Sequence, residues 1–107
     1  MGGEERRQHP RALCELRVRI LSPKSGSAIC KDISQSGMLI ELQRPPLIPE
    51  GKEIQISFQL DRKKRPISTR AEVMRHASRT AMGVRFLMLP MDEMQAIAAF
   101  VAAGKPA

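Results

Sequence analysis

Between residues 53 and 60 the sequence reads EIQISFQL, and this stretch decides the fold. Every second residue from Ile54 to Leu60 is apolar, and the residues between them are polar. Side chains of a strand point alternately to its two faces, so this period of two predicts a strand with one face in a core and the other in solvent. The chain is therefore expected to fold around a sheet.

The same alternation appears on both sides of this strand, over residues 12–20, 27–31, 38–42, 67–75 and 81–87. Turn-forming residues separate these segments, as in SPKSG at residues 22–26. Residues 44–51 contain three prolines, which lack the N–H that a central strand needs, so we expect a loop there. The charged run DRKKR at residues 61–65 is expected to be a solvated hairpin tip.

The last part of the chain changes to a helical period. Pro90 suits the first position of a helix, and the acidic Asp92 and Glu93 suit the positive end of the helix dipole. The apolar residues that would form one face are Met94, Ile97, Phe100 and Val101. We place this helix over residues 90–103, with Gly104 and Pro106 ending it.

About six short strands followed by one amphipathic helix predict a mainly all-β fold, either a small barrel or a sandwich. At 107 residues the chain is long enough for one modest core, and we treat residues 1–107 as a single domain. Residues 12–88 would form the barrel and residues 90–103 the helix that covers an end or an edge of it. Residues 1–11 would form an N-terminal arm.

The composition is that of an ordinary globular protein, with 42% hydrophobic and 27% charged residues. The longest apolar run, residues 96–103, is far shorter than the roughly 20 residues that a bilayer requires, so we expect no membrane insertion. The first residues carry charges with no apolar stretch behind them, unlike a secretory signal. The expected location is therefore the cytoplasm.

A net charge of +7 favours an anionic partner. The chain has three Phe and no Tyr or Trp, whereas proteins that bind single-stranded nucleic acid rely on aromatic side chains for base stacking. The composition therefore argues against nucleic acid as the partner, although a small basic nucleic-acid-binding barrel stays open as an alternative.

Cys14 and Cys30 each lie inside an expected strand. Two cysteines alone cannot complete a tetrahedral metal site, and His9 and His76 lack ligand-like spacing to them. We expect two buried free thiols, with no metal and no cofactor. The sequence also offers no catalytic constellation, so we expect no enzyme.

Two short clusters flank the first pair of expected strands. The first supplies guanidinium groups: Arg6, Arg7 and Arg11. The second supplies a carboxylate, a hydroxyl and a permissive backbone position: Asp32, Ser34 and Gly37. Guanidinium forks match phosphate oxygens and the O6 and N7 edge of guanine, while a carboxylate can accept from the N–H groups of guanine. A ligand that carries both phosphate and guanine would satisfy both clusters.

These clusters, in this order and spacing, resemble the paired signature of PilZ domains. The matching motifs are RxxxR over residues 7–11 and DxSxxG over residues 32–37. The resemblance continues through a Pro-rich crossover to AEVMR at residues 71–75 and GVRF at residues 83–86. It covers nearly the whole chain, from about Glu5 to the closing helix.

PilZ domains are receptors for cyclic diguanylate (c-di-GMP), built on a six-stranded antiparallel β-barrel, and the resemblance implies that fold here, with a C-terminal α-helix. It implies that Arg7 and Arg11 contact phosphates and guanine edges, with Arg6 assisting. The residues implied to hold a guanine and its ribose-phosphate are Asp32, Ser34 and Gly37. Whether Arg75 and Arg85 join the site is left open.

The implied function is that of a non-enzymatic c-di-GMP receptor that relays the signal to an unidentified effector protein. Because half of the site precedes the first strand, we hypothesise that a mobile N-terminal arm, residues 1–11, closes onto the barrel when the ligand binds. The alternatives are a PilZ-like adaptor that binds no nucleotide and the basic nucleic-acid-binding barrel.

Overall fold

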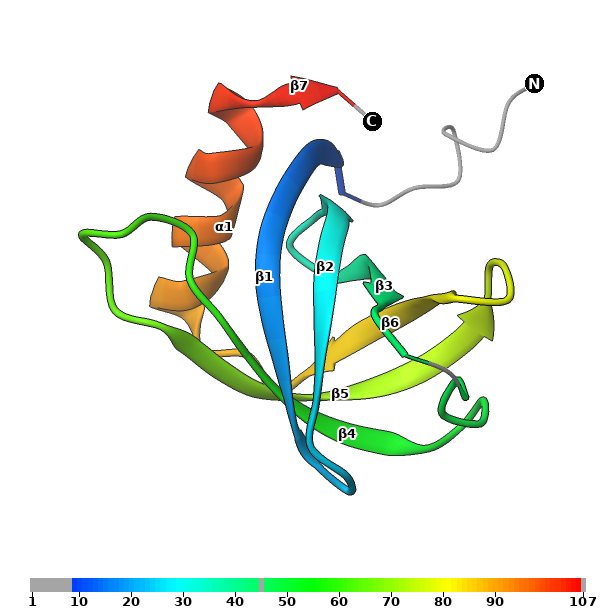
Figure 1. Cartoon of the computed structure of the whole chain (residues 1–107). Coiled ribbons are helices and arrows are strands. Elements are labelled where there is room, and N and C mark those ends of the chain that lie inside the picture. Colours follow the sequence, from blue (N-terminus) through cyan, green and yellow to red (C-terminus); the bar gives the residue numbers. More distant parts are fainter. Residues whose placement is uncertain (1–8, 45, 107) are drawn as a thin grey trace.

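The chain alternates strands and turns up to its C-terminal part, which is helical (Figure 1). The structure is a computed structural model and describes residues 9–44 and 46–106. Its elements in chain order are β1 (Ala12–Ser22), β2 (Gly26–Ile33), β3 (Gly37–Leu42), β4 (Glu53–Phe58), β5 (Ile67–His76), β6 (Ala81–Leu87), α1 (Met91–Ala103) and β7 (Lys105–Pro106). Strands pair in the order β2-β3-β6-β5-β4-β1, and β1 returns to β2, which closes a six-stranded antiparallel barrel. The predicted mainly all-β barrel with a closing helix is confirmed.

Inward-facing residues of the alternating segments fill the barrel. In β4 the buried positions are Ile54, Ile56 and Phe58, as the period of two predicted. The strand residues with almost no exposed surface include Val18, Ile20, Ile33, Met38, Ile40, Ile54, Ile56, Val73 and Met82. Within this core the rings of Phe58 and Phe86 stack with centroids 5.9 Å apart. Each Å² of apolar surface removed from water in this way contributes about 25 cal/mol to stability.

Strand β1 pairs with both β2 and β4 and thereby closes the barrel. Its first residue, Ala12, lies opposite Ile33, the last residue of β2. The register shifts between Leu13 and Leu16, where an irregular strand twists more strongly than a regular one. This pairing brings Arg11, directly before β1, next to the end of β2.

Helix α1 packs against the barrel through the apolar face that the sequence predicted. Ile97 is fully buried, and Phe100 and Val101 are partly buried against the core. The helix begins at Met91, one residue later than predicted, because Pro90 has an extended conformation (φ −60°, ψ 151°) and precedes the helix as its N-cap.

The chain does not end with the helix. The predicted stop at Gly104 is confirmed, but β7 then pairs with the start of β1, with Ala12 opposite Pro106 and Leu13 opposite Lys105. A strand of two residues has no period, so the sequence pattern gave no sign of it.

The expected loop and tip are also present. The described residues of the 44–51 segment contain no strand, while Pro45 lies outside the described part of the chain. The tip at residues 61–65 is exposed throughout, and the main-chain N–H of Lys63 donates to the carboxylate of Asp61 over 3.0 Å. Within residues 9–44 and 46–106 no helix is long and apolar enough to cross a membrane.

Candidate ligand-binding site

The two predicted clusters meet through Arg11 and Asp32. Because β1 and β2 pair with Leu13 opposite Asp32, the guanidinium that precedes β1 reaches the carboxylate near the end of β2. The Nε of Arg11 donates to Oδ1 of Asp32 over 2.7 Å, and its Nη2 lies 2.5 Å from the same oxygen. The two side chains are only 23% and 18% exposed, so this ion pair is screened less by solvent than a surface pair.

The turn between β2 and β3 is held by the Ser34 hydroxyl. The main-chain N–H of Ser36 donates to Oγ of Ser34 over 3.2 Å, and the main-chain N–H of Ser34 donates to the carbonyl of Gly37 over 2.8 Å. Ser34 is fully buried, and Nη1 of Arg11 lies 3.5 Å from its Oγ. This hydroxyl therefore shapes the turn between β2 and β3.

Gly37 lets strand β3 lie close to strand β6. A Cβ at this position would collide with the main-chain carbonyl of Val84, so any side chain would push the two strands apart. Gly37 pairs with Arg85, and the main-chain N–H of Phe86 donates to the carbonyl of Ser36 over 2.9 Å. The turn is thus attached to β6 as well as to β2.

A polar groove of about 440 Å³ opens beside this turn. Its charged lining residues are Arg11, Asp32, Arg75 and Arg85. Arg85 pairs with Glu72 over 2.7 Å, and the Arg75 side chain lies across Gly83, where an added Cβ would be 3.4 Å from its Cγ. The residue before β1 and strands β2, β5 and β6 therefore bring three guanidinium groups and one carboxylate to a single hollow.

The PilZ domain family model matches residues 5–103. The chain belongs to the PilZ domain family. No curated protein matches the sequence. Among solved structures, this PilZ domain is similar to the inhibitor of motility MotI/DgrA from Bacillus subtilis, with a TM-score of 0.80 and 22% identity over 91% of this chain and 49% of that chain.

Two structures from Escherichia coli are also similar. YcgR in complex with c-di-GMP gives a TM-score of 0.74 and 18% identity over 92% of this chain and 45% of that chain. The PilZ domain of YcgR with c-di-GMP gives 0.71 and 15% over 92% of this chain and 90% of that chain. This PilZ domain spans about half the length of MotI and of the longer YcgR chain, and at these identities the likeness shows the fold.

The structure places four of the six predicted site residues near one another. It brings together Arg11, Asp32, Ser34 and Gly37. Arg6 and Arg7 lie outside the described residues of the PilZ domain, as do residues 1–8 of the predicted mobile arm, and their roles stay predictions.

The sequence left open whether Arg75 and Arg85 belong to the site. Both residues line the groove in this PilZ domain. Their approach to Gly37 follows from the pairing of β3 with β6 and of β6 with β5, which local patterns do not encode. In the sequence, the two arginines were indicated only by the family-like segments that contain them, at residues 71–75 and 83–86.

The cysteines differ from their prediction in one respect. Both are free, as expected, and Cys30 is buried, but Cys14 is only half-buried. Cys14 keeps its place in the inward alternation of β1, between the exposed Leu13 and Glu15, but lies beside a shallow surface hollow. Among the residues that the structure describes, no group of three or more His, Cys, Asp or Glu side chains could hold a metal ion.

Proposed function

We propose that this PilZ domain is a non-enzymatic receptor that binds c-di-GMP and relays the signal to a partner protein. The observation that carries the proposal is the meeting of Arg11 and Asp32 at one polar groove, although they lie 21 residues apart. Membership of the PilZ family supports it, as does the fold that this chain shares with YcgR, a protein solved in complex with c-di-GMP.

The groove has the chemistry that this ligand needs. c-di-GMP carries two phosphates and two guanines, so arginines can contact anionic oxygens or the O6 and N7 acceptors. The Asp32 carboxylate can accept from N1–H and N2–H of guanine, whereas adenine offers no such pair of donors. We assign Arg11 to phosphate and guanine edges, and Asp32, Ser34 and Gly37 to one guanine with its ribose-phosphate.

Further arginines would enlarge the site. We propose that Arg6 and Arg7 close over the ligand from the arm, with Arg7 contacting phosphate. Arg75 and Arg85 line the same groove and are assigned to the second phosphate or guanine. Arg85 also pairs with Glu72 at the surface, so a ligand would compete with this carboxylate for its guanidinium.

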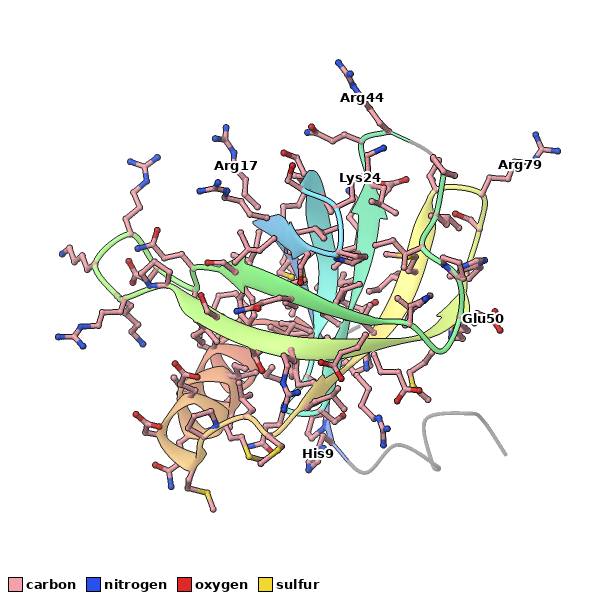
Figure 2. The ribbon with its side chains drawn as sticks, turned by 90° about the horizontal axis from the view of Figure 1, so that it is seen from below. His9, Arg17, Lys24, Arg44, Glu50 and Arg79 are labelled. Atoms are coloured by element: carbon pink, nitrogen blue, oxygen red, sulfur yellow. The ribbon has the colours of Figure 1, made fainter. Side chains whose placement is uncertain are left out.

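Calorimetric titration of the wild type and of Arg11→Ala with c-di-GMP tests the proposal. Loss of a bidentate contact costs roughly 1–3 kcal/mol, so the variant should bind about ten- to a hundredfold more weakly. Arg17→Ala is the matched control, because Arg17 is exposed and lies on the opposite side of the barrel from His9, the neighbour of Pro10 and Arg11 (Figure 2). It should bind as the wild type does.

Two control ligands test the assignment of Asp32. GTP offers one guanine and an open phosphate chain, and cyclic diadenylate offers the same ring with bases that lack the paired donors. Both should bind more weakly than c-di-GMP. Absence of heat with micromolar c-di-GMP would reject the receptor and favour the nucleotide-independent adaptor.

A second candidate function rests on a different hollow. A groove of about 550 Å³ on the outer face of β1, β2 and β4 is lined by Arg17 and Arg19 together with neutral residues, and its described lining has no carboxylate. Because its charged residues are both arginines, this groove is the observation that favours the alternative function of a small nucleic-acid-binding barrel. That function predicts that the protein is retained on duplex DNA. A plot of the logarithm of the binding constant against the logarithm of the salt concentration should fall with a slope of about 0.9 for each phosphate contacted. Arg17→Ala should make this slope smaller.

A further inference from the structure

Two cysteines face each other where β1 leaves its regular pairing with β2. The sulfur atoms of Cys14 and Cys30 are 3.3 Å apart, and both thiols are free. A disulfide requires a sulfur separation of about 2.0 Å. The two residues belong to paired neighbouring strands, and their sulfur atoms are already in contact.

The two thiols differ in their access to solvent. Cys14 is half-buried and borders a shallow surface hollow that Leu13, Glu15 and Lys31 also line. Cys30 has no exposed surface, and its sulfur lies 3.2 Å from the main-chain carbonyl oxygen of Asp32. A small polar reagent therefore reaches Cys14 and is kept from Cys30.

The pKa values of the two thiols are also shifted in opposite directions. The hydrogen bond with the Cys30 thiol lowers the pKa of Cys14, and the main-chain N–H of Leu16 adds to this effect while burial opposes it. The same hydrogen bond, followed by burial, raises the pKa of Cys30. Cys14 is thus the more acidic thiol of the pair, and the thiolate is the reactive form of cysteine.

We propose that Cys14 and Cys30 form a dithiol site that reacts with hydrogen peroxide or a similar small hydroperoxide. The Cys14 thiolate attacks one peroxide oxygen, the O–O bond breaks, and hydroxide leaves Cys14 as a sulfenic acid. The Cys30 sulfur then attacks the Cys14 sulfur, the S–O bond breaks, and the departing hydroxide takes the Cys30 proton. Two thiols and one peroxide give one disulfide and two waters, and the two electrons pass from the sulfurs to the peroxide.

Oxidation of Cys14 itself prepares Cys30 for the second step. The negative charge of Cys14 is one of the causes that raise the pKa of Cys30, and a sulfenic acid is neutral. Once that charge is gone, the Cys30 proton is released more readily, and its sulfur is already in contact with the atom that it must attack. The geometry therefore favours disulfide formation over further oxidation of Cys14.

The test uses the full chain without c-di-GMP, so its result does not depend on the proposed function. After reaction with one equivalent of hydrogen peroxide, alkylation of remaining thiols and intact-mass measurement should show both thiols lost, two hydrogens fewer and no added oxygen. Dithiothreitol should restore both thiols. The disulfide should also raise the thermal midpoint, because it restricts the unfolded chain.

Two variants separate the roles of the sulfurs. Cys30→Ser should accumulate a Cys14 sulfenic acid that dimedone traps. Cys14→Ser should keep its Cys30 thiol, with oxidation at least about tenfold slower than in the wild type. The wild-type measurement stands alone if a variant does not fold.

Three results would overturn the proposal. The wild type could keep both thiols under conditions that oxidise free cysteine, or it could form only disulfides between molecules. Alternatively, Cys14→Ser could lose its remaining thiol as fast as the wild type.

Discussion

Among single residues, Arg11 and Asp32 form the pair on which the proposed binding depends. The two side chains satisfy each other, and both are largely shielded from solvent. Removing one partner of such a pair leaves a poorly solvated charge, which is costly. In the proposed function, a ligand with both anionic oxygens and guanine N–H donors would replace each partner in turn, so neither charge would be left alone. This exchange would give selectivity for a nucleotide over simple phosphate.

Gly37 is the residue whose substitution should harm the fold most directly. A Cβ there meets the Val84 carbonyl, so Gly37→Ala should force β3 from β6 and lower the free energy of unfolding by about 1–3 kcal/mol. Gly26→Ala is the matched control, because nothing lies within 4 Å of its added Cβ. Urea unfolding of both variants measures the difference. Equal stability of the two would contradict the close approach described here.

Among the elements, α1 owes its position to one buried side chain. Ile97 has no exposed surface and joins the barrel core, so Ile97→Ala should lower the free energy of unfolding by about 2–5 kcal/mol. Gln95 is exposed on the same helix, and Gln95→Ala should change stability by no more than about 0.5 kcal/mol. Denaturant titration followed by circular dichroism compares the two. A small loss at Ile97 would mean that the helix contributes little to the core.

The elements were largely predictable because each long strand carries its own period. Burial follows the alternation throughout β4 and as far as Val73 in β5, and Thr69, Ala71 and Val73 share the buried face as their spacing predicted. The pattern gave no sign of β7, which has no period, or of the register shift after Val73, beyond which Arg75 is exposed. Local spacing cannot report either event.

The site was predictable where its residues flank one hairpin. Arg11 and Asp32 lie at the ends of two strands that are consecutive in the chain, so their motifs could be read together. Arg75 and Arg85 reach the groove only through strand pairings that join distant parts of the sequence. The buried position of Ser34 likewise follows from its turn and not from its residue type.

At the level of the whole molecule, ligand binding should order the N-terminal arm. Half of the proposed site precedes β1, and fixing each residue costs about 1–2 kcal/mol in conformational entropy, which ligand contacts must offset. Amide hydrogen exchange should therefore slow over residues 4–12 when c-di-GMP saturates the domain. Exchange in β4, which contributes no residue to the lining of the polar groove, serves as the internal control and should not change. Full binding with unaltered exchange in the arm would reject the closing movement.

The short strand β7 has a consequence for the architecture of the chain. It lies beside the first residues of β1, with Pro106 opposite Ala12, so the described beginning and end of the fold are neighbours. A brief linker could join them, and new termini could be opened in the exposed tip at residues 61–65. The domain is therefore suited to circular permutation, in which the barrel would keep every strand pairing while the order of its hairpins along the polypeptide changes.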